Sequence, residues 1–515
     1  MIDPSIIIDP PRPSDHPDNL LWVDEQIWGH RLWDSQSSWL VFLEFLNLAE
    51  ACLREEKLLE EGGCYYPLSF KPYKRMHLRN ILFNNEKLSE VALRVPDNES
   101  AWAEWLEWMA DNAKGATGGF SYLKTRFPSF HEFSALIGML KSSAVESDTN
   151  RRWSSRFVFP FGPHGLYEDL NITPSGSVSR EYINFGLTGE LLYKMLSRSE
   201  KKEQVRPYLA RMLSGENPWD KLLLRLQPDF SNDLATRGNS FLPYRAHASF
   251  DRLGEDWLSV CELQLPGFDS FPFLVTLSAF HVVLYQLTLG SQWNEEEQKP
   301  FFVCEVLAPK KTLIRELAGT SYQRNNLLTL QTVENYIRRI EQSQEWQSAT
   351  QQPGSFELCR QLLIDQVRWP KDPEDYDGCN DPQTLLWELR RVAKNRHQQH
   401  AGNVHRNYGR DIGLISKRGT NKLRYAPNDS LLKALVLANV RTRMEYNEFL
   451  SRLYNRYGLI FGDRQAEVVL EKGEFDKKAF QANSVRLEQR LGSLGMLRRL
   501  SDACAYVQNP FSTRS

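Results

Sequence analysis

The sequence is poor in cysteine, and its cysteines lack the spacing that zinc sites and disulfide frameworks require. The seven cysteines are scattered and odd in number, and none forms a Cys-x-x-Cys pair. This argues against a zinc ribbon or a disulfide scaffold and is typical of a reducing compartment. Residues 1–17 are acidic and proline-rich and lack the basic start and apolar run of a signal peptide. We therefore expect a cytoplasmic protein.

Standard catalytic motifs are missing as well. The chain has no Walker-type loop with a Lys-Ser/Thr pair, no Gly-x-Gly-x-x-Gly, no His-Glu-x-x-His and no Gly-x-Ser-x-Gly. We expect a protein that is not an enzyme and needs no cofactor. One long apolar run, Phe271 to Leu289, approaches the length of a membrane span. Its internal polar residues and the lack of a basic flank favour a buried core helix instead.

The bulk composition is that of a soluble globular protein of more than one domain. A chain of 515 residues is too long for a single core, and 41% apolar and 25% charged residues are ordinary proportions. Half of the 14 tryptophans precede residue 110. Trp102 and Trp105 recur at helical spacing, which favours an aromatic core over a groove for a partner.

The apolar spacing predicts a mainly α protein with a few short strands. We expect helices at Leu20–Glu61, Glu190–Met195, Asp220–Leu226, Leu253–Cys261, Thr312–Glu341 and Phe356–Val367, and strands at 156–162 and 301–307. Candidate core positions of the helix over Thr312–Glu341 are Leu313, Leu317, Leu327, Leu330, Val333 and Ile337. The expected division is an extended arm (1–18), a Trp-rich helical domain (19–150), a helical domain with short strands (151–341), a helical region with a basic segment (354–427) and a C-terminal domain (428–515).

The C-terminal domain is expected to resemble a winged helix. Three short helices, around 431–436, 446–454 and 479–491, precede the segment MLRRLSDACAYV, which predicts a hairpin with Ser501-Asp502 at its turn. Such an order can place a helix in a major groove, although winged helices also bind proteins. Four arginines near the third helix and the hairpin favour nucleic acid: Arg486, Arg490, Arg498 and Arg499.

Carboxylates are scarce between residues 390 and 424. Ten cations lie in this basic segment against one acid, Asp411, although the whole chain has a net charge of −2. The ten are Arg390, Arg391, Lys394, Arg396, Arg406, Arg410, Lys417, Arg418, Lys422 and Arg424. A cation that meets a phosphate releases condensed counterions, so the segment suits DNA. A solvated basic helix face is the alternative.

Two sets of side chains could support a metal or a nuclease centre. His397, His400 and His405 could bind a metal with Cys379 or a carboxylate, although zinc sites usually show tighter paired spacing. Asp256, Glu262 and Gln264 loosely imitate the acids of a nuclease, but acids at such a helix end are usually solvated. We expect no metal site.

The segment from Phe356 to Gly409 resembles the EH-signature family, named for a Glu and a downstream His in a helical domain. The matching residues are Glu357, in SFELCRQLLIDQ, and His400, in AKNRHQQHAGNVHRNYG; Glu388, His397 and His405 are alternatives. Members form component C of Zorya antiphage systems. The resemblance implies a DNA-binding protein that acts beside a membrane-embedded motor and a helicase-nuclease effector. A hydrogen-bonded Glu–His pair could hold the basic segment in one conformation or act as a general base.

The predicted function is therefore sequence-independent binding of duplex DNA in antiphage defence. Two alternatives stay open. One is a metal-dependent nuclease that uses Glu357 and His400. The other is a scaffold that binds proteins through its tryptophan-rich residues 1–110.

Overall fold

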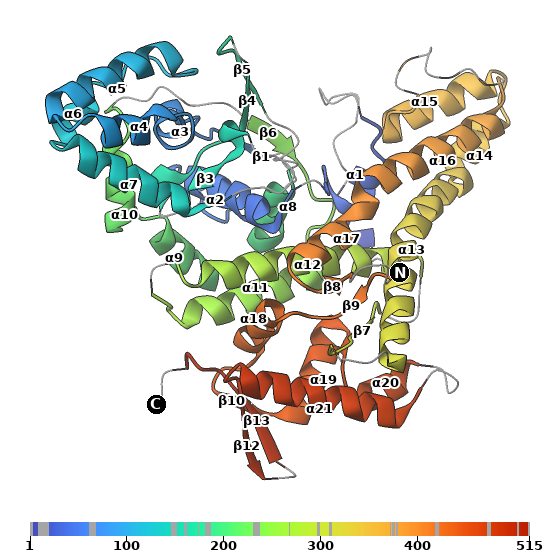
Figure 1. Ribbon diagram of the computed structural model, residues 1–515. Coiled ribbons are helices and arrows are strands. Elements are labelled where there is room, and N and C mark those ends of the chain that lie inside the picture. Colours follow the sequence, from blue (N-terminus) through green and yellow to red (C-terminus); the bar gives the residue numbers. More distant parts are fainter. Residues whose placement is uncertain are drawn as a thin grey trace.

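A computed structural model describes most of the chain (Figure 1). The described residues are 4–8, 20–34, 36–60, 68–145, 152–158, 162–173, 175–180, 187–229, 237–266, 268–295, 299–307, 312–370, 372, 376, 378, 380–417, 422–470, 475–501 and 504–512. Helices make up most of them, and the strands have two to five residues. The predicted class, mainly α with a few short strands, is confirmed. Of the predicted N-terminal arm, only residues 4–8 are described. They contain a short helix, η1 (Pro4–Ile6), and a bridge from Ile7 to Tyr244.

The N-terminal lobe, at the upper left of Figure 1, is built around aromatic rings. Trp102 and Trp105 are fully buried and pack against Phe130 and Phe133. The expectation that these tryptophans belong to a core is confirmed. Helix α1 (Val23–Trp28) lies apart from this lobe, to its right in Figure 1. The elements that follow it in the chain are α2 (Ser38–Arg54), β1 (Leu68–Phe70), α3 (Met76–Phe83), α4 (Lys87–Arg94), α5 (Asn98–Asn112), α6 (Tyr122–Arg126), α7 (Phe130–Ser142), β2 (Ala144–Val145), η3 (Trp153–Ser155), β3 (Phe157–Val158), η4 (Pro163–Gly165), β4 (Leu170–Ile172) and β5 (Val178–Arg180).

The single helix predicted over Leu20–Glu61 is wrong, because the chain breaks between α1 and α2. Gly29 has a φ of +102°, and a Cβ there would lie 2.9 Å from the carbonyl oxygen of Phe241. Only glycine fits this conformation and this close approach. Ser37 then starts α2 by accepting a hydrogen bond from the backbone N–H of Leu40 at 3.3 Å.

Helix α12 (Phe271–Trp293) is the central helix of the protein. It packs against α2, α11, α13, α17 and α18. Within the described part of the chain it is the one helix long and apolar enough to cross a membrane, and 83% of its most apolar stretch is buried inside the protein. It therefore lies in the surroundings expected of a core helix. The other elements here are α8 (Thr188–Ser197), α9 (Lys202–Met212), α10 (Pro218–Arg225), β6 (Arg237–Ser240), α11 (Ala248–Glu262) and β7 (Phe302–Val303).

Helix α13 (Leu313–Gln342) is the longest described helix and leads into an arm at the right of Figure 1. Leu317, Val333 and Ile337 are buried as predicted, but Leu313 and Leu327 are exposed. The face that meets α12 carries Leu328 rather than Leu327, one position further along the helix. The arm and its return contain α14 (Gln344–Thr350), α15 (Ser355–Val367), α16 (Pro382–Gln399), α17 (Ala401–Asp411), β8 (Ile415–Ser416) and β9 (Arg424–Tyr425).

The C-terminal unit follows the predicted order of helices and hairpin, with one extra helix. It contains α18 (Asp429–Asn439), β10 (Arg443–Glu445), α19 (Tyr446–Tyr457), β11 (Leu459–Ile460), α20 (Asp463–Val469), α21 (Lys477–Ser493), β12 (Leu497–Ser501) and β13 (Cys504–Gln508). Strands β10, β13 and β12 form an antiparallel sheet in that order. Helix α20 was not predicted. Ser501 ends β12, while residues 502–503 of the turn lie outside the described residues.

One hydrophobic core runs through all of these parts. It extends from Leu21 to Val507 and crosses each predicted domain boundary beyond residue 19. Strand β11 also pairs in parallel with β7, so the C-terminal unit completes a two-stranded sheet with the middle of the chain. The predicted division into domains stays a prediction, but its parts share a common interior.

Candidate nucleic-acid interface

The cations of the basic segment on α16 are largely neutralised. Three of them meet carboxylates from distant parts of the chain. The pairs are Arg390–Glu341, Arg396–Glu25 and Lys394–Glu334, the last at 3.5 Å. Arg391 is exposed, and no carboxylate among the described residues pairs with it. It lies beside Trp387 in a shallow groove between α13 and α16.

Arg424 is a structural residue. Its side chain is 2% exposed and is bonded to Glu305, whose side chain is 0% exposed. Glu305 also accepts a hydrogen bond from Nε of Arg315 at 2.8 Å. A guanidinium buried in this way is not exposed to a DNA phosphate in this structure, so its burial argues against the prediction that Arg424 binds DNA.

The remaining cations of the basic segment keep their charge available to solvent. Arg410, Lys417 and Lys422 are exposed, and Arg406 is half-buried beside Asn407. Within the described ranges, no carboxylate pairs with any of these four. Arg418 lies outside the described residues. About half of the ten predicted cations therefore remain free to meet a polyanion.

The three histidines of the segment have separate environments. His397 is bonded to Asp24 at 2.7 Å and to Thr329 at 3.0 Å. His400 stacks on Trp33 with 4.2 Å between ring centroids. His405 is buried, and its Nε2 is hydrogen-bonded to the Tyr425 hydroxyl at 2.8 Å. Across the part of the chain that the structure describes, no group of three or more His, Cys, Asp or Glu side chains gathers in a way that could hold a metal. Cys379 lies outside that part.

His405 makes stability sensitive to acid. Burial lowers the pKa of its imidazole to about 3, against about 6.5 in an unfolded chain. Below about pH 6.5 the His405 imidazole therefore binds a proton in the unfolded state but not in the folded state. The free energy of unfolding falls as the pH drops below that value. At pH 5 the expected loss from this residue is about 2 kcal/mol relative to pH 7. Urea denaturation at the two pH values measures it.

A His405→Asn variant should lose this part of the pH dependence, whatever its stability at pH 7. Burial also lowers the pKa of His247 and His281, so a smaller acid effect should persist in the variant. His131→Asn, in the N-terminal lobe, is the matched control and should keep the full dependence. An unchanged slope in His405→Asn would contradict the assignment.

The candidate signature residues Glu357 and His400 do not meet. Glu357 lies on α15 with its side chain 69% exposed and pairs with Arg360, one turn along the same helix. His400 lies at the junction of α16 and α17, 3.8 Å from Asp34. Among the described residues no contact joins the two. The suggested Glu–His pair is therefore not formed in this structure.

Helix α21 presents a different face to solvent from the one expected. Arg486 is half-buried, and Arg490 bonds to Asp429 at 2.6 Å and to the Pro427 carbonyl at 3.2 Å. The exposed side carries Lys477, Lys478, Val485 and Gln489. No carboxylate in the described ranges pairs with either lysine. Sequence reasoning missed these lysines, although Asp476, which caps α21, placed them in its first turn.

The hairpin beside α21 adds further positive charge. Arg498 and Arg499 of β12 are both exposed. Arg499 lies 3.6 Å from Glu488 of α21, whereas no carboxylate of the described chain pairs with Arg498. The hairpin extends away from the end of α21 at the bottom of Figure 1. We refer to Lys477, Lys478, Val485, Gln489 and Arg498 as the α21–hairpin face. The two lysines lie at the start of α21, and Arg498, which pairs with Tyr506, points to the side of the sheet opposite Arg499.

Residues 383–509 match the family model of the methylation-associated defense system protein MAD7. The match indicates a defence-system protein. The comparison with curated proteins found no match, and neither did the comparison with solved structures. The region similar to MAD7 runs from the first turn of α16 to the end of the C-terminal sheet. It therefore contains both the basic segment and the α21–hairpin face, and it leaves out the first 382 residues.

The suggested nuclease acids have separate surroundings too. Asp256 is fully buried and is bonded to the Tyr457 hydroxyl and to His281, each at 2.7 Å, and to Arg456. Glu262 and Gln264 instead line an open cleft. Asp256 thus belongs to a buried ionic cluster, whereas Glu262 and Gln264 belong to the surface. The expectation that Asp256 is solvated is therefore wrong.

Proposed function

We propose that this chain binds duplex DNA as a component of a prokaryotic antiphage defence system. The observation that carries the proposal is the α21–hairpin face, where three cations lack carboxylate partners in the described chain and lie on a helix and an adjacent hairpin. A helix of this kind fits a major groove, and the hairpin then reaches the phosphate backbone. The order of α18, β10, α19, α21 and the hairpin supports a winged-helix interpretation.

Binding should be largely independent of sequence. The exposed side of α21 offers two lysines, a valine and a glutamine, and the hairpin offers Arg498. Charge therefore dominates, and contacts to phosphate position a protein without reading bases. The exposed cations Arg410, Lys417 and Lys422 of the basic segment supply additional attraction.

The test is a Lys478→Gln, Arg498→Gln double variant of the full chain. We expect its affinity for a labelled duplex to fall about tenfold or more at moderate salt. The slope of log affinity against log salt should shrink by about 2, because each lost phosphate contact removes close to one released counterion. Fluorescence anisotropy across a salt series measures both quantities.

The matched control is a Lys71→Gln, Lys221→Gln double variant, which removes the same charge from exposed lysines of the N-terminal half. It should bind DNA like the unmodified chain. An equal loss of DNA affinity in both double variants would show that the effect comes from net charge alone. Binding without salt dependence would end the electrostatic proposal.

The proposal includes the partners that the EH-signature resemblance implies. The chain would act in the cytoplasm with a membrane motor and a helicase-nuclease of a Zorya-like system and would carry out no catalysis itself. Co-purification with those two partners tests the assembly. Adding divalent metal to the DNA-binding reactions tests the nuclease alternative. That alternative requires DNA cleavage that the Glu357→Ala substitution abolishes.

A scaffold role for the N-terminal tryptophans has less support. Trp22, Trp28, Trp102 and Trp105 are fully buried, so their rings are not available to a partner. A pull-down that depends on residues 1–110, from a chain without DNA affinity, would restore that alternative.

A further inference from the structure

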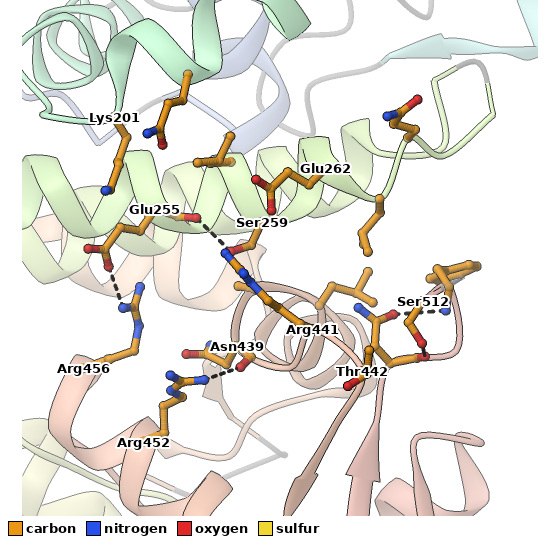
Figure 2. Close-up of a pocket in the computed structure, with 18 residues that line it drawn as sticks. Lys201, Glu255, Ser259, Glu262, Asn439, Arg441, Thr442, Arg452, Arg456 and Ser512 are labelled. Carbon is orange, nitrogen blue, oxygen red and sulfur yellow. Dashed lines mark hydrogen bonds and ion pairs between the residues drawn. The ribbon is translucent and has the colours of Figure 1, made fainter. Parts of the chain in front are cut away.

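A cleft of about 1220 Å³ separates α11 from the C-terminal unit (Figure 2). One wall is the face of α11 that carries Glu255, Ser259 and Glu262, spaced so that all three point the same way. The other wall consists of α19, the loop after α18 and the residues after β13. Ligand pockets usually enclose about 300–1,000 Å³, so this cleft holds a molecule of several rings with water to spare.

The charges on the two walls are unequal and incompletely paired. Arg441 is exposed, and no hydrogen bond or ion pair holds it within the described residues. Arg452 lies on the same wall and meets no carboxylate there, and Lys201 lies at the start of α9. Glu262 faces them from α11, with no cation within ion-pair distance among the described residues. Figure 2 shows Arg441 reaching toward α11 between these groups. The cleft thus keeps three cations and one carboxylate for something that enters it.

Arg452 and Arg456 of the cationic wall are held in place from behind. Arg452 donates to the Asn439 carbonyl at 2.7 Å, which fixes its guanidinium at the end of α18. Arg456 is bonded to Glu255 at 2.6 Å and to the buried Asp256. These contacts order the two arginines before any ligand arrives, so less of their conformational entropy is lost on binding.

We propose that this cleft binds a ribonucleoside phosphate. Arg441 and Arg452, with Lys201, meet the phosphates, since guanidinium groups match phosphate oxygens in charge and geometry. Glu262 accepts hydrogen bonds from the ribose hydroxyls, the role that an acidic residue takes in dinucleotide sites. Phe511, 45% exposed at the cleft, offers a ring face to the base.

This site is separate from the α21–hairpin face and needs no Walker loop. Its ligand is a nucleoside phosphate, which could be a free nucleotide or the terminus of an RNA strand. The size of the cleft and its polar hydroxyls, Ser259, Thr442 and Ser512, fit either source. The two sources are told apart by comparing mononucleotides with a short oligoribonucleotide.

The experiment is calorimetric titration of the full chain with ATP, GTP, CTP and UTP, with a 5′-phosphorylated oligoribonucleotide, and with inorganic triphosphate. At least one nucleotide or the oligonucleotide should bind more tightly than inorganic triphosphate. Arg441→Gln and Arg452→Gln should each weaken that binding about tenfold, which is the value of one charge-assisted phosphate contact. Tighter binding of the oligonucleotide than of every mononucleotide assigns the site to an RNA terminus.

The matched control is Arg443→Gln. It removes an exposed arginine of β10 that lies two residues from Arg441 in the chain but does not line the cleft. It should leave nucleotide binding unchanged. Glu262→Ala should remove the preference for a ribonucleotide over its 2′-deoxy counterpart while the thermal midpoint stays the same. Absence of binding by the unmodified chain, equal binding of inorganic triphosphate, or arginine variants that bind normally would each overturn the proposal. Salt-dependent duplex binding is measured apart from these titrations, so the two proposals succeed or fail separately.

Discussion

Replacing Asp256 by alanine is expected to lower the free energy of unfolding by about 3–5 kcal/mol, the usual result of removing one partner of a buried ionic cluster. Asp256 is fully buried, and its two oxygens satisfy the Tyr457 hydroxyl, His281 and Arg456. Without it, the first two groups lose their buried acceptor, and Glu255 is the one carboxylate that still pairs with Arg456 among the described residues. Urea denaturation of the full chain measures the loss.

The same substitution should loosen the C-terminal unit. Asp256 and His281 belong to α11 and α12, whereas Arg456 and Tyr457 belong to α19, so the cluster joins the unit to the body. Limited proteolysis should therefore cut the variant first between the two parts. Asp251→Ala is the control, because Asp251 accepts one bond from the Glu200 backbone at the surface. A stable Asp256→Ala chain would contradict this, and a stable chain that had lost DNA cleavage would indicate a catalytic acid instead.

Arg424→Ala should also destabilise the protein, again by about 3–5 kcal/mol. The variant leaves Glu305 fully buried with Arg315 as its remaining cation. A sequence-based interpretation predicts the opposite phenotype, a folded protein with weaker DNA binding. Thermal unfolding and DNA affinity, measured on the same preparation, separate the two outcomes.

Lys422→Ala provides the comparison, since Lys422 lies two residues away and is exposed. It should change stability by less than about 0.5 kcal/mol, as surface substitutions usually do. A stable Arg424→Ala chain with a specific loss of DNA affinity would show that the arginine leaves its buried position to meet DNA.

Local signals in the sequence were sufficient for the class of the fold and for many elements. The apolar run at 271–289 became the buried α12, and the hairpin at 496–507 became β12 and β13. These elements are specified by residues close together in the chain, through helical spacing or alternation. The break at Gly29 was missed because its cause, the approach of the Phe241 backbone, comes from a residue about 210 positions away.

The charge of the basic segment could not be judged from its own residues. Ten cations faced one acid along the sequence, yet Glu25, Glu305, Glu334 and Glu341 reach four of them in the fold. Each acid lies at least 49 residues from its partner in the chain. An excess of positive charge along a stretch of sequence thus does not fix the charge at the protein surface. The electrostatic potential there also depends on acidic residues that the fold brings close.

The face of α21 was within reach of sequence reasoning but depended on the helical phase. Phe480, Leu487 and Leu491 form its buried stripe. Arg486 and Arg490 flank that stripe, whereas Lys478, Val485 and Gln489 lie on the opposite side at helical spacing. Counting arginines led to Arg486 and Arg490, which lie beside the buried stripe. Assigning the buried stripe of the helix first would have led to Lys478 on the exposed side.

The central position of α12 has a consequence for synthesis of the chain. Helix α18, which covers one side of α12, begins about 140 residues after α12 ends. At about 5–20 residues per second, the ribosome needs roughly 7–30 s to reach the start of α18. During this interval a 23-residue apolar helix stands partly uncovered on the nascent chain. We therefore expect the nascent protein to depend on a chaperone that holds this helix. We also expect the yield of folded protein to rise when the segment between α12 and α18 is translated faster.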